Sequence, residues 1–217
     1  MCSLDAEKAF DSCNWLILFH KLYHDRHIPL PVVKVLLSLY QKGRYSVRNK
    51  NEMSYSFNAT QGVFQGSILS PHLYNIYTEE LLKNIENENL SGTSIYGIFT
   101  GVIAYADDII LLSSTINGLQ KLLDKCTGYF NTTAISLNID KTEFLSSGKQ
   151  STASFINLNH FLVSPQERLK HLGFVWCSKK NGYVSLNTEN LQERLNKFWA
   201  VIHSLIKGVS AFVTQTV

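Results

Sequence analysis

The sequence lacks the features that mark membrane proteins and disulfide-rich secreted proteins. No apolar run approaches the roughly 20 residues that a membrane span needs. The first residues carry no basic region followed by an apolar stretch, so we expect no secretory signal. The four cysteines, Cys2, Cys13, Cys126 and Cys177, form no Cys-x-x-Cys pair. This spacing indicates reduced thiols in an intracellular protein rather than a disulfide framework or a zinc site.

The chain does contain enough apolar material for a sizeable core, since 45% of its 217 residues are hydrophobic. Its net charge is only +3 but is unevenly distributed. Residues 1–140 hold 11 Lys/Arg against 13 Asp/Glu, and residues 141–217 hold 9 against 4. An acidic N-terminal segment and a basic C-terminal segment suit a polyanionic ligand held beside a metal centre. Ordinary surface charge explains so small an excess equally well.

The hydrophobic pattern predicts a mixed α+β fold in which helices cover one face of a mainly antiparallel sheet. Asp11 is the expected cap of the first helix, and Ser70 is the expected cap of a later helix opened by Pro71. Buried strands are expected over residues 102–104 and 109–112, and a hairpin over 45–48 and 55–58 around the loop 49–52. The expected helices cover residues 11–25, 31–40, 70–81, 117–130 and 187–207.

Tyr105-Ala106-Asp107-Asp108 lies between the two expected buried strands. Adjacent carboxylates at the tip of such a hairpin repel one another and lose hydration, and a divalent cation is the usual compensation. A solvated Asp-Asp turn is the plain alternative. Asp5 closes another short apolar stretch, so it could join Asp107 and Asp108 in a three-carboxylate site for a hard cation.

The segment from Gln61 to Pro71 is the second candidate for a binding role. Gly62 and Gly66, four residues apart, would let the backbone come close to a bound group, and Gln65 offers both a donor and an acceptor. His20 and His24 share a helix face, but the residues between them include no Glu, as a metalloprotease motif would need. For these two histidines we expect a solvated or packing role.

In their order and spacing these segments resemble the catalytic palm of a reverse transcriptase, and most closely those of non-LTR (LINE-type) retrotransposons. A group II intron or telomerase type of enzyme is the alternative within this class. The resemblance covers about residues 3–176 and implies a polymerase palm with a ferredoxin- or RRM-like core. The matching segments are residues 5–11 (Asp-Ala-Glu-Lys-Ala-Phe-Asp), 65–71 (Gln-Gly-Ser-Ile-Leu-Ser-Pro), 104–108 (Ala-Tyr-Ala-Asp-Asp), 138–143 (Asn-Ile-Asp-Lys-Thr-Glu) and 171–174 (His-Leu-Gly-Phe).

The resemblance implies a two-metal nucleotidyl transfer of dNTPs onto a primer 3′-hydroxyl. Asp5, Asp107 and, less directly, Asp108 would hold two Mg²⁺ ions, with Mn²⁺ as an alternative, about 4 Å apart. The backbone carbonyl of Ala6 would help to hold the ion on the nucleotide side. Lys141 is similar to the lysine that assists pyrophosphate departure, and a solvated surface lysine is the alternative.

The resemblance also assigns contacts to nucleotide and primer. Phe10 resembles the aromatic gate beneath the sugar, and a core phenylalanine is the alternative. Gln65 and Gly66 would contact the incoming nucleotide or its template base. Leu172 and Gly173 resemble the hairpin that grips the primer end. Ala134 stands where the family usually has a glycine at a helix end, so we expect a strained turn there.

The expected partners are an RNA template, a DNA primer and dNTPs, with no membrane. We expect residues 1–180 to form a palm without its fingers region, and residues 181–217 to begin a thumb or a C-terminal helix. The chain would then be a fragment of a retroelement polyprotein, with weak or no activity without the fingers and endonuclease regions. The family implies cytoplasmic assembly and nuclear action. A non-catalytic nucleic-acid-binding remnant and, from another class, a palm-fold nucleotide cyclase are the alternatives.

Overall fold

The computed structural model describes residues 1–87, 91–147, 155–178 and 191–198. The chain divides into two compact units, residues 1–144 with 154–164, and residues 145–153 with 165–217. No helix within the described ranges is long and apolar enough to cross a bilayer. The expected domain boundary near residue 180 stays a prediction. Of the helix expected over 187–207, residues 191–198 are helical, and the remainder lies outside the described residues.

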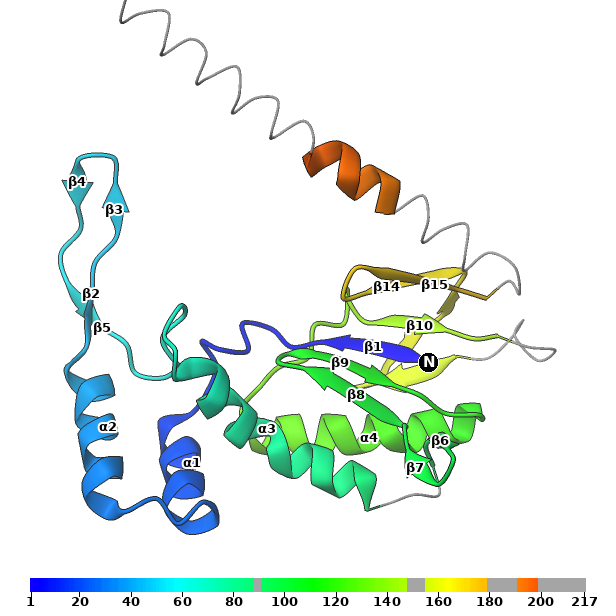
Figure 1. Ribbon diagram of the computed structural model, residues 1–217, viewed down its shortest axis with the longest axis horizontal. Coiled ribbons are helices and arrows are strands. Elements are labelled where there is room, and N and C mark those ends of the chain that lie inside the picture. The colour runs from blue at the N-terminus through cyan, green and yellow to red at the C-terminus, as the bar shows by residue number, and fades with distance from the viewer. Residues whose placement is uncertain (88–90, 148–154, 179–190, 199–217) are drawn as a thin grey trace, which may run out of the picture. The chain divides into compact units, whose positions relative to one another are not determined.

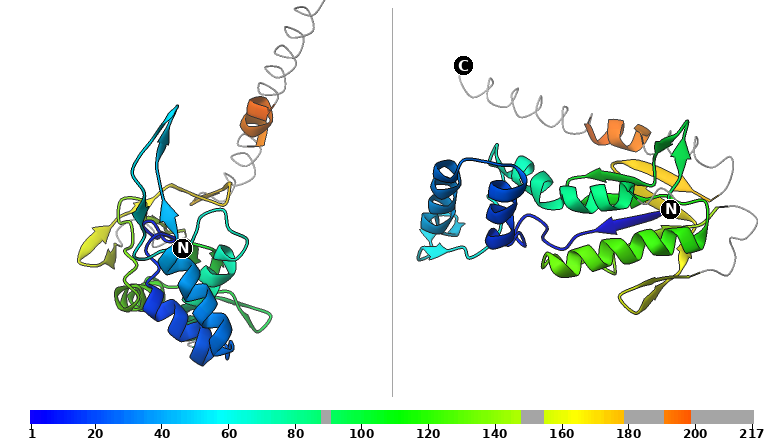
Figure 2. Two further views of the ribbon diagram at one scale, coloured as in Figure 1. Left: turned by 90° about the vertical axis from the view of Figure 1, so that its left-hand side faces the viewer. Right: turned by 90° about the horizontal axis from the view of Figure 1, so that it is seen from below.

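The first unit is built on an antiparallel sheet whose strand order is β10-β1-β9-β8. β1 is central, and its residue Asp5 stands directly opposite Asp108 of β9. The helices α3 and α4 run side by side along one face of this sheet (Figure 1, Figure 2). The elements are β1 (Cys2–Asp5), β8 (Val102–Tyr105), β9 (Asp108–Leu111), β10 (Glu143–Leu145), α3 (Ser70–Glu86) and α4 (Ile116–Thr132).

The core lies between these two helices and the sheet. The apolar side chains that recur at helical spacing in α4, Leu119, Leu122, Leu123 and Cys126, are all buried. In α3 Leu73, Tyr77 and Leu81 are buried, and Ile76 is partly buried. They meet alternate residues of the central strands, as a sheet with one covered face requires. The core residues of these elements include Cys2, Leu4, Leu73, Tyr77, Leu81, Ile109, Leu111, Leu119, Leu122, Leu123, Cys126, Phe130 and Phe144.

Between β1 and α3 the chain forms a second group of helices and a long hairpin. α1 (Trp15–His20) continues directly into the π-helix η1 (Lys21–Asp25), and α2 (Leu30–Lys42) leads into the hairpin. The inner ladder of the hairpin pairs β2 (Arg44–Tyr45) with β5 (Phe57–Asn58). Its outer ladder pairs β3 (Arg48–Asn49) with β4 (Glu52–Met53).

Short two-stranded pairs complete the described chain. In the first unit β6 (Ser94–Ile95) pairs with β7 (Ile98–Phe99), and β11 (Ile156–Leu158) pairs with β12 (Phe161–Val163). The second unit contains β13 (Pro165–Gln166) and a hairpin of β14 (Arg168–His171) and β15 (Phe174–Cys177).

Both helix-cap predictions are wrong. Asn14, not Asp11, caps the first helix, because its side-chain oxygen accepts hydrogen bonds from the backbone N–H groups of Leu16 and Ile17 at 2.9 and 3.4 Å. Ser70 lies inside α3, and its hydroxyl donates to the backbone carbonyl of Phe64 at 2.5 Å. In both cases the chain before the helix makes a tight turn that the local sequence does not reveal.

The prediction of a buried strand holds for β9 but is wrong for β8. Ile109, Ile110 and Leu111 are buried, whereas Ile103 is 49% exposed and Tyr105 is 68% exposed. β8 is at the edge of the sheet in the first unit, so only one of its sides has a neighbouring strand. An apolar, β-branched run predicts a strand but does not tell a central strand from an edge strand.

Candidate active site

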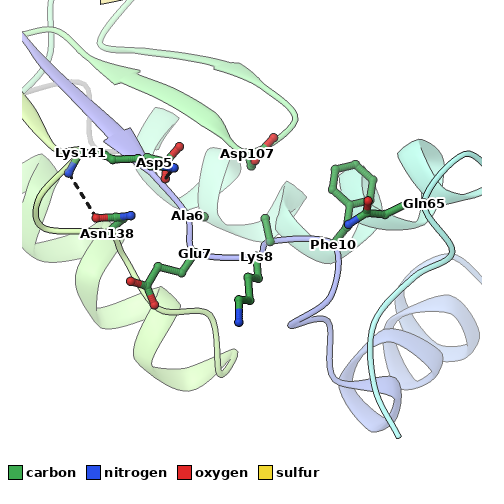
Figure 3. A pocket seen from close by; sticks show the side chains of 10 residues that line it. Asp5, Ala6, Glu7, Lys8, Phe10, Gln65, Asp107, Asn138 and Lys141 are labelled. Carbon is green, nitrogen blue, oxygen red and sulfur yellow. Dashed lines mark hydrogen bonds and ion pairs between the residues drawn. The ribbon is translucent and has the colours of Figure 1, made fainter. Parts of the chain in front are cut away.

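A cleft of about 540 Å³ opens at the end of β1, where the segment after Asp5 passes the β8–β9 turn (Figure 3). Six residues that the sequence predicted for the site line this cleft: Asp5, Ala6, Phe10, Gln65, Asp107 and Lys141. Glu7, Lys8, Ala9 and Asn138 also line it. The fold thus brings residues from four distant parts of the chain to one cavity within the first unit.

The sheet places the carboxylates by strand register. Asp5 ends β1, and Asp108 begins β9 directly opposite it. Asp107 lies in the two-residue turn between β8 and β9, beside Ala106, whose φ is +54°. A residue with a Cβ adopts such a conformation at a cost of about 1–2 kcal/mol. The turn therefore holds a strained residue immediately before the carboxylate that it presents.

Asp107 is electrostatically disfavoured as an anion. Burial raises the pKa of its carboxyl, and the negative charges of Asp108 and Asp5 raise this pKa further. A hydrogen bond from its own backbone and the positive charge of Lys141 act in the opposite direction but do not outweigh these effects. A cation bound between Asp5 and Asp107 would relieve this repulsion.

Asn138 and Lys141 fix the other wall of the cleft. The backbone N–H of Asn138 donates to the backbone carbonyl of Asp5 at 2.8 Å, and its side-chain oxygen accepts from the N–H of Lys141 at 3.2 Å (Figure 3). Lys141 Nζ then lies 3.2 Å from Asp5 Oδ2. Asn138 and Lys141 therefore belong to a small turn that is hydrogen-bonded to the end of β1. This turn places the Lys141 ammonium beside the carboxylate of Asp5, the last residue of β1. The role of Asn138 was missed, although it opens the Asn-x-x-Lys-Thr segment, because it acts mainly on the backbone.

Phe10 and Gln65 lie at the opposite end of the cleft (Figure 3). The ring of Phe10 stacks on Tyr74 with centroids 4.9 Å apart and an angle of 16°. Gln65 Nε2 donates a hydrogen bond to Asp11 Oδ1 at 3.1 Å. Asp11, which we expected to cap the first helix, thus holds the side chain of Gln65 instead. Phe10 is half-buried, so its ring is both part of the core margin and a wall of the cleft.

The two glycines near Gln65 have different roles. A Cβ on Gly62 would lie 2.9 Å from the backbone oxygen of Asp11, and Gly62 has a φ of +91°. Gly66 has a φ of +84° but has open space around its α-carbon, and it does not line the cleft. The close backbone approach is thus made at Gly62, whereas Gly66 supplies a left-handed turn beside Gln65.

The structure does not gather all the predicted site residues. Asp108 does not line the cleft, and within the described ranges no group of three or more His, Cys, Asp or Glu side chains lies close enough together to hold a metal ion. Leu172 and Gly173, with φ values of +48° and +83°, form the tight turn of the β14–β15 hairpin in the second unit. The metal site and the primer contact therefore stay predictions.

Solved structures with a similar fold include telomerases. The apo telomerase of Candida tropicalis, truncated from its C-terminal domain, has a TM-score of 0.58 at 18% identity, over 82% of this chain and 33% of that one. The Candida albicans telomerase, solved with a TWJ fragment of telomeric RNA, has a TM-score of 0.59 at 13% identity, over 82% and 29%. The fold is accordingly that of a palm-type polymerase.

The family model described as reverse transcriptase (RNA-dependent DNA polymerase) matches residues 1–176, and the chain belongs to this family. It is 33% identical over 141 residues to the retrovirus-related Pol polyprotein of the type-2 retrotransposable element R2DM of Drosophila melanogaster, covering 65% of this chain and 13% of that protein. It is 28% identical over 195 residues to the RNA-directed DNA polymerase of the mobile element jockey of Drosophila funebris, covering 80% and 19%. The chain thus spans less than a fifth of these relatives.

Proposed function

We propose that the cleft catalyses RNA-directed DNA synthesis, the transfer of a nucleotide from a dNTP to a primer 3′-hydroxyl. The observation that carries the proposal is the convergence of Asp5, Asp107 and Lys141 with Phe10 and Gln65 in one cavity of a reverse-transcriptase-family palm. The relatives named as RNA-directed DNA polymerases and the telomerase solved with RNA support RNA as the template.

The donor set fits a hard divalent cation such as Mg²⁺. Asp5 and Asp107 offer carboxylate oxygens, and Ala6 lies in the same cavity with its backbone carbonyl as a further oxygen donor. Asp108 lies opposite Asp5 in the sheet and would complete the negative charge. When bound, the metal would supply charge stabilisation and an activated hydroxyl.

The chain's own residues would position the reactants. Lys141 carries a mobile ammonium, 65% exposed in its side chain, which can turn from Asp5 towards a triphosphate. Phe10 lines the cleft with a ring that stacks on Tyr74, and beneath a bound sugar its bulk would oppose a 2′-hydroxyl. Gln65 offers an amide to the nucleotide or its template base. Positioning and electrostatics, rather than covalent chemistry, would account for most of the rate.

The test is extension of a DNA primer on an RNA template with Mg²⁺, using the wild type and Asp107→Ala. We expect weak extension by the wild type and its loss in the variant, since a metal-binding charge is removed. Asp124→Asn is the matched control, because this exposed aspartate lies away from the cleft and the asparagine keeps the oxygen that Gln120 contacts. Extension that survives Asp107→Ala would overturn the proposal.

A non-catalytic nucleic-acid-binding remnant is the second candidate. It is favoured by the pairing of Lys141 with Asp5, which neutralises a carboxylate without a metal. Primer binding that is identical with and without Mg²⁺ and dNTP, together with no extension, would support it. A cyclic nucleotide formed without primer would instead support a palm-fold cyclase.

A further inference from the structure

The long hairpin after α2 is a second surface with the chemistry of a nucleic-acid contact. Residues 42–58 contain Lys42, Arg44, Arg48 and Lys50 against a single acidic residue, Glu52. All four cations are exposed, and none forms an ion pair within the part of the chain that the structure describes. Arg44 in β2 and Arg48 in β3 lie on the same arm of the hairpin. The hairpin therefore presents positive charge that nothing in the described protein neutralises.

The register of the hairpin shows a β-bulge. In the outer ladder Arg48 faces Met53, and Ser54 N donates to Val47 O at 2.9 Å. In the inner ladder Tyr45 faces Phe57. Between the two ladders one residue, Ser46, is therefore opposed by two, Tyr55 and Ser56. The Ser54 hydroxyl stabilises this irregularity, because it accepts from Val47 N at 2.8 Å and donates to Tyr55 O at 2.9 Å.

The bulge carries an aromatic side chain that has no role in the core. Tyr55 is 97% exposed, whereas its neighbours Tyr45 and Phe57 stack on each other with centroids 6.1 Å apart. Bulges commonly re-aim a side chain for function. A fully solvated ring among cations is the arrangement on which unstacked bases stack while their phosphates are neutralised.

The base of the hairpin is anchored beside the cleft. Tyr45 contacts the ring of Phe64 at 5.8 Å between centroids, and Tyr40 stacks on the same ring at 4.3 Å. Phe64 directly precedes Gln65, which lines the cleft. Figure 1 shows the β3–β4 end projecting away from the end of α2. The ring contacts of Phe64 thus connect the base of the hairpin to the segment that carries Gln65.

We propose that the β2–β5 and β3–β4 hairpin binds single-stranded nucleic acid, with Tyr55 stacking on a base and Arg44 and Arg48 contacting phosphates. Charge complementarity favours a polyanion over an apolar protein surface, since an apolar partner would bury the unpaired cations at high cost. The contact requires neither metal nor catalysis, so it can be tested independently of the polymerase activity.

The test is fluorescence anisotropy of labelled oligouridine, oligothymidine and a duplex on the full chain, without Mg²⁺ or dNTP. We expect Tyr55→Ala to weaken binding of the single strands about 10-fold and Tyr55→Phe to restore it, because stacking needs the ring and not the hydroxyl. Binding of the duplex, whose bases are already stacked, should change little. If Tyr55→Ala weakens binding of oligouridine and oligothymidine equally, the hairpin recognises the bases and phosphates that RNA and DNA share. If binding of oligouridine is weakened more, the RNA strand is the ligand of the hairpin.

The charge contribution has a separate readout. Arg44→Gln with Arg48→Gln should reduce the slope of log Kd against log salt by about 1.4, because each phosphate contact on a single strand contributes about 0.7. Tyr96→Ala is the matched aromatic control, since Tyr96 is as exposed on the β6–β7 hairpin, and Lys34→Gln with Lys121→Gln is the matched charge control. No measurable binding by the wild type, or equal effects of the hairpin variants and their controls, would overturn the proposal and leave a protein partner as the explanation of the exposed ring.

Discussion

One side chain of the cleft, the carboxylate of Asp107, lowers the stability of the folded protein at neutral pH. Asp107 has a raised pKa because it is partly buried and lies near Asp5 and Asp108. The folded protein therefore binds more protons than the unfolded chain between the ordinary value of 3.8 and the raised value. Stability falls as the pH rises through this window, and the deficit persists at neutral pH.

We predict that Asp107→Asn is more stable than the wild type at pH 7, by less than about 1 kcal/mol because the carboxyl is still partly solvated. The difference should vanish below the ordinary pKa of the carboxyl, where the aspartate is protonated in both states. Urea unfolding at both pH values measures this. An Asp107→Asn protein that is less stable than the wild type at pH 7 would contradict the argument.

At the scale of elements, α3 carries two buried tyrosines with opposite hydrogen-bond status. Tyr77 OH donates to the carbonyl of Thr133 at 2.5 Å and accepts from Asn14 N at 3.2 Å, so it links α3 to the end of α4 and to the cap of α1. Tyr74 OH is equally buried, yet has no hydrogen-bond partner among the described residues. The same helix therefore contains one hydroxyl that stabilises the packing and one that is desolvated without compensation.

We predict that Tyr77→Phe lowers the free energy of unfolding by about 1–3 kcal/mol, because the buried carbonyl of Thr133 and the partly buried N–H of Asn14 lose this partner. Tyr74→Phe should leave it unchanged or raise it by about 1 kcal/mol, because it removes only an unpaired hydroxyl. Chemical denaturation of both variants measures the contrast. Equal losses in the two variants would contradict the argument, because both variants keep the ring and only the hydroxyl of Tyr77 is hydrogen-bonded.

The elements also show what the sequence could predict. The helical stripe of α4 and the strand β9 were correct, because periodicity and β-branching act through local burial. The prediction of a strained turn at Ala134 was also confirmed, because this alanine has a φ of +57° after the end of α4. The exposure of β8 and the hairpin bulge depend on strand order and on cross-strand contacts, which no local pattern contains. The caps were misassigned because Asn14 and Leu69, rather than Asp11 and Ser70, directly precede the helices.

The site was more predictable than the details of the fold around it. Asp5, Gln65, Asp107 and Lys141 were identified because their chemistry is unusual for their positions and the motifs occur in order. Asn138 was missed as a site residue because it works through backbone hydrogen bonds. Asp108 and Gly66 do not line the cleft, although their neighbours Asp107 and Gln65 do.

At the scale of the whole molecule, binding of a cation in the cleft would be coupled to folding, because the cleft joins segments that are far apart in the chain. A cation held by Asp5 and Asp107 would bridge β1 to the β8–β9 turn and would bind the folded state only. Its effect on stability is then RT ln(1 + [Mg²⁺]/Kd), or about 1.4 kcal/mol at ten times the Kd. For a chain of 217 residues this corresponds to a rise in Tm of roughly 3–5 °C.

We predict this rise for the wild type and for Asp124→Asn, but not for Asp5→Asn or Asp107→Asn, in thermal unfolding with and without Mg²⁺. Ionic strength must be matched with KCl, because screening alone would also relieve the repulsion among the carboxylates.

The ammonium of Lys141 competes for Asp5 at 3.2 Å, so Lys141→Met should bind Mg²⁺ more tightly and show a larger rise in Tm at the same concentration. Equal rises in all five proteins would mean that the ion acts as a general salt. A rise that is lost only with the cleft aspartates would place the cation in the cleft without any appeal to enzymatic activity.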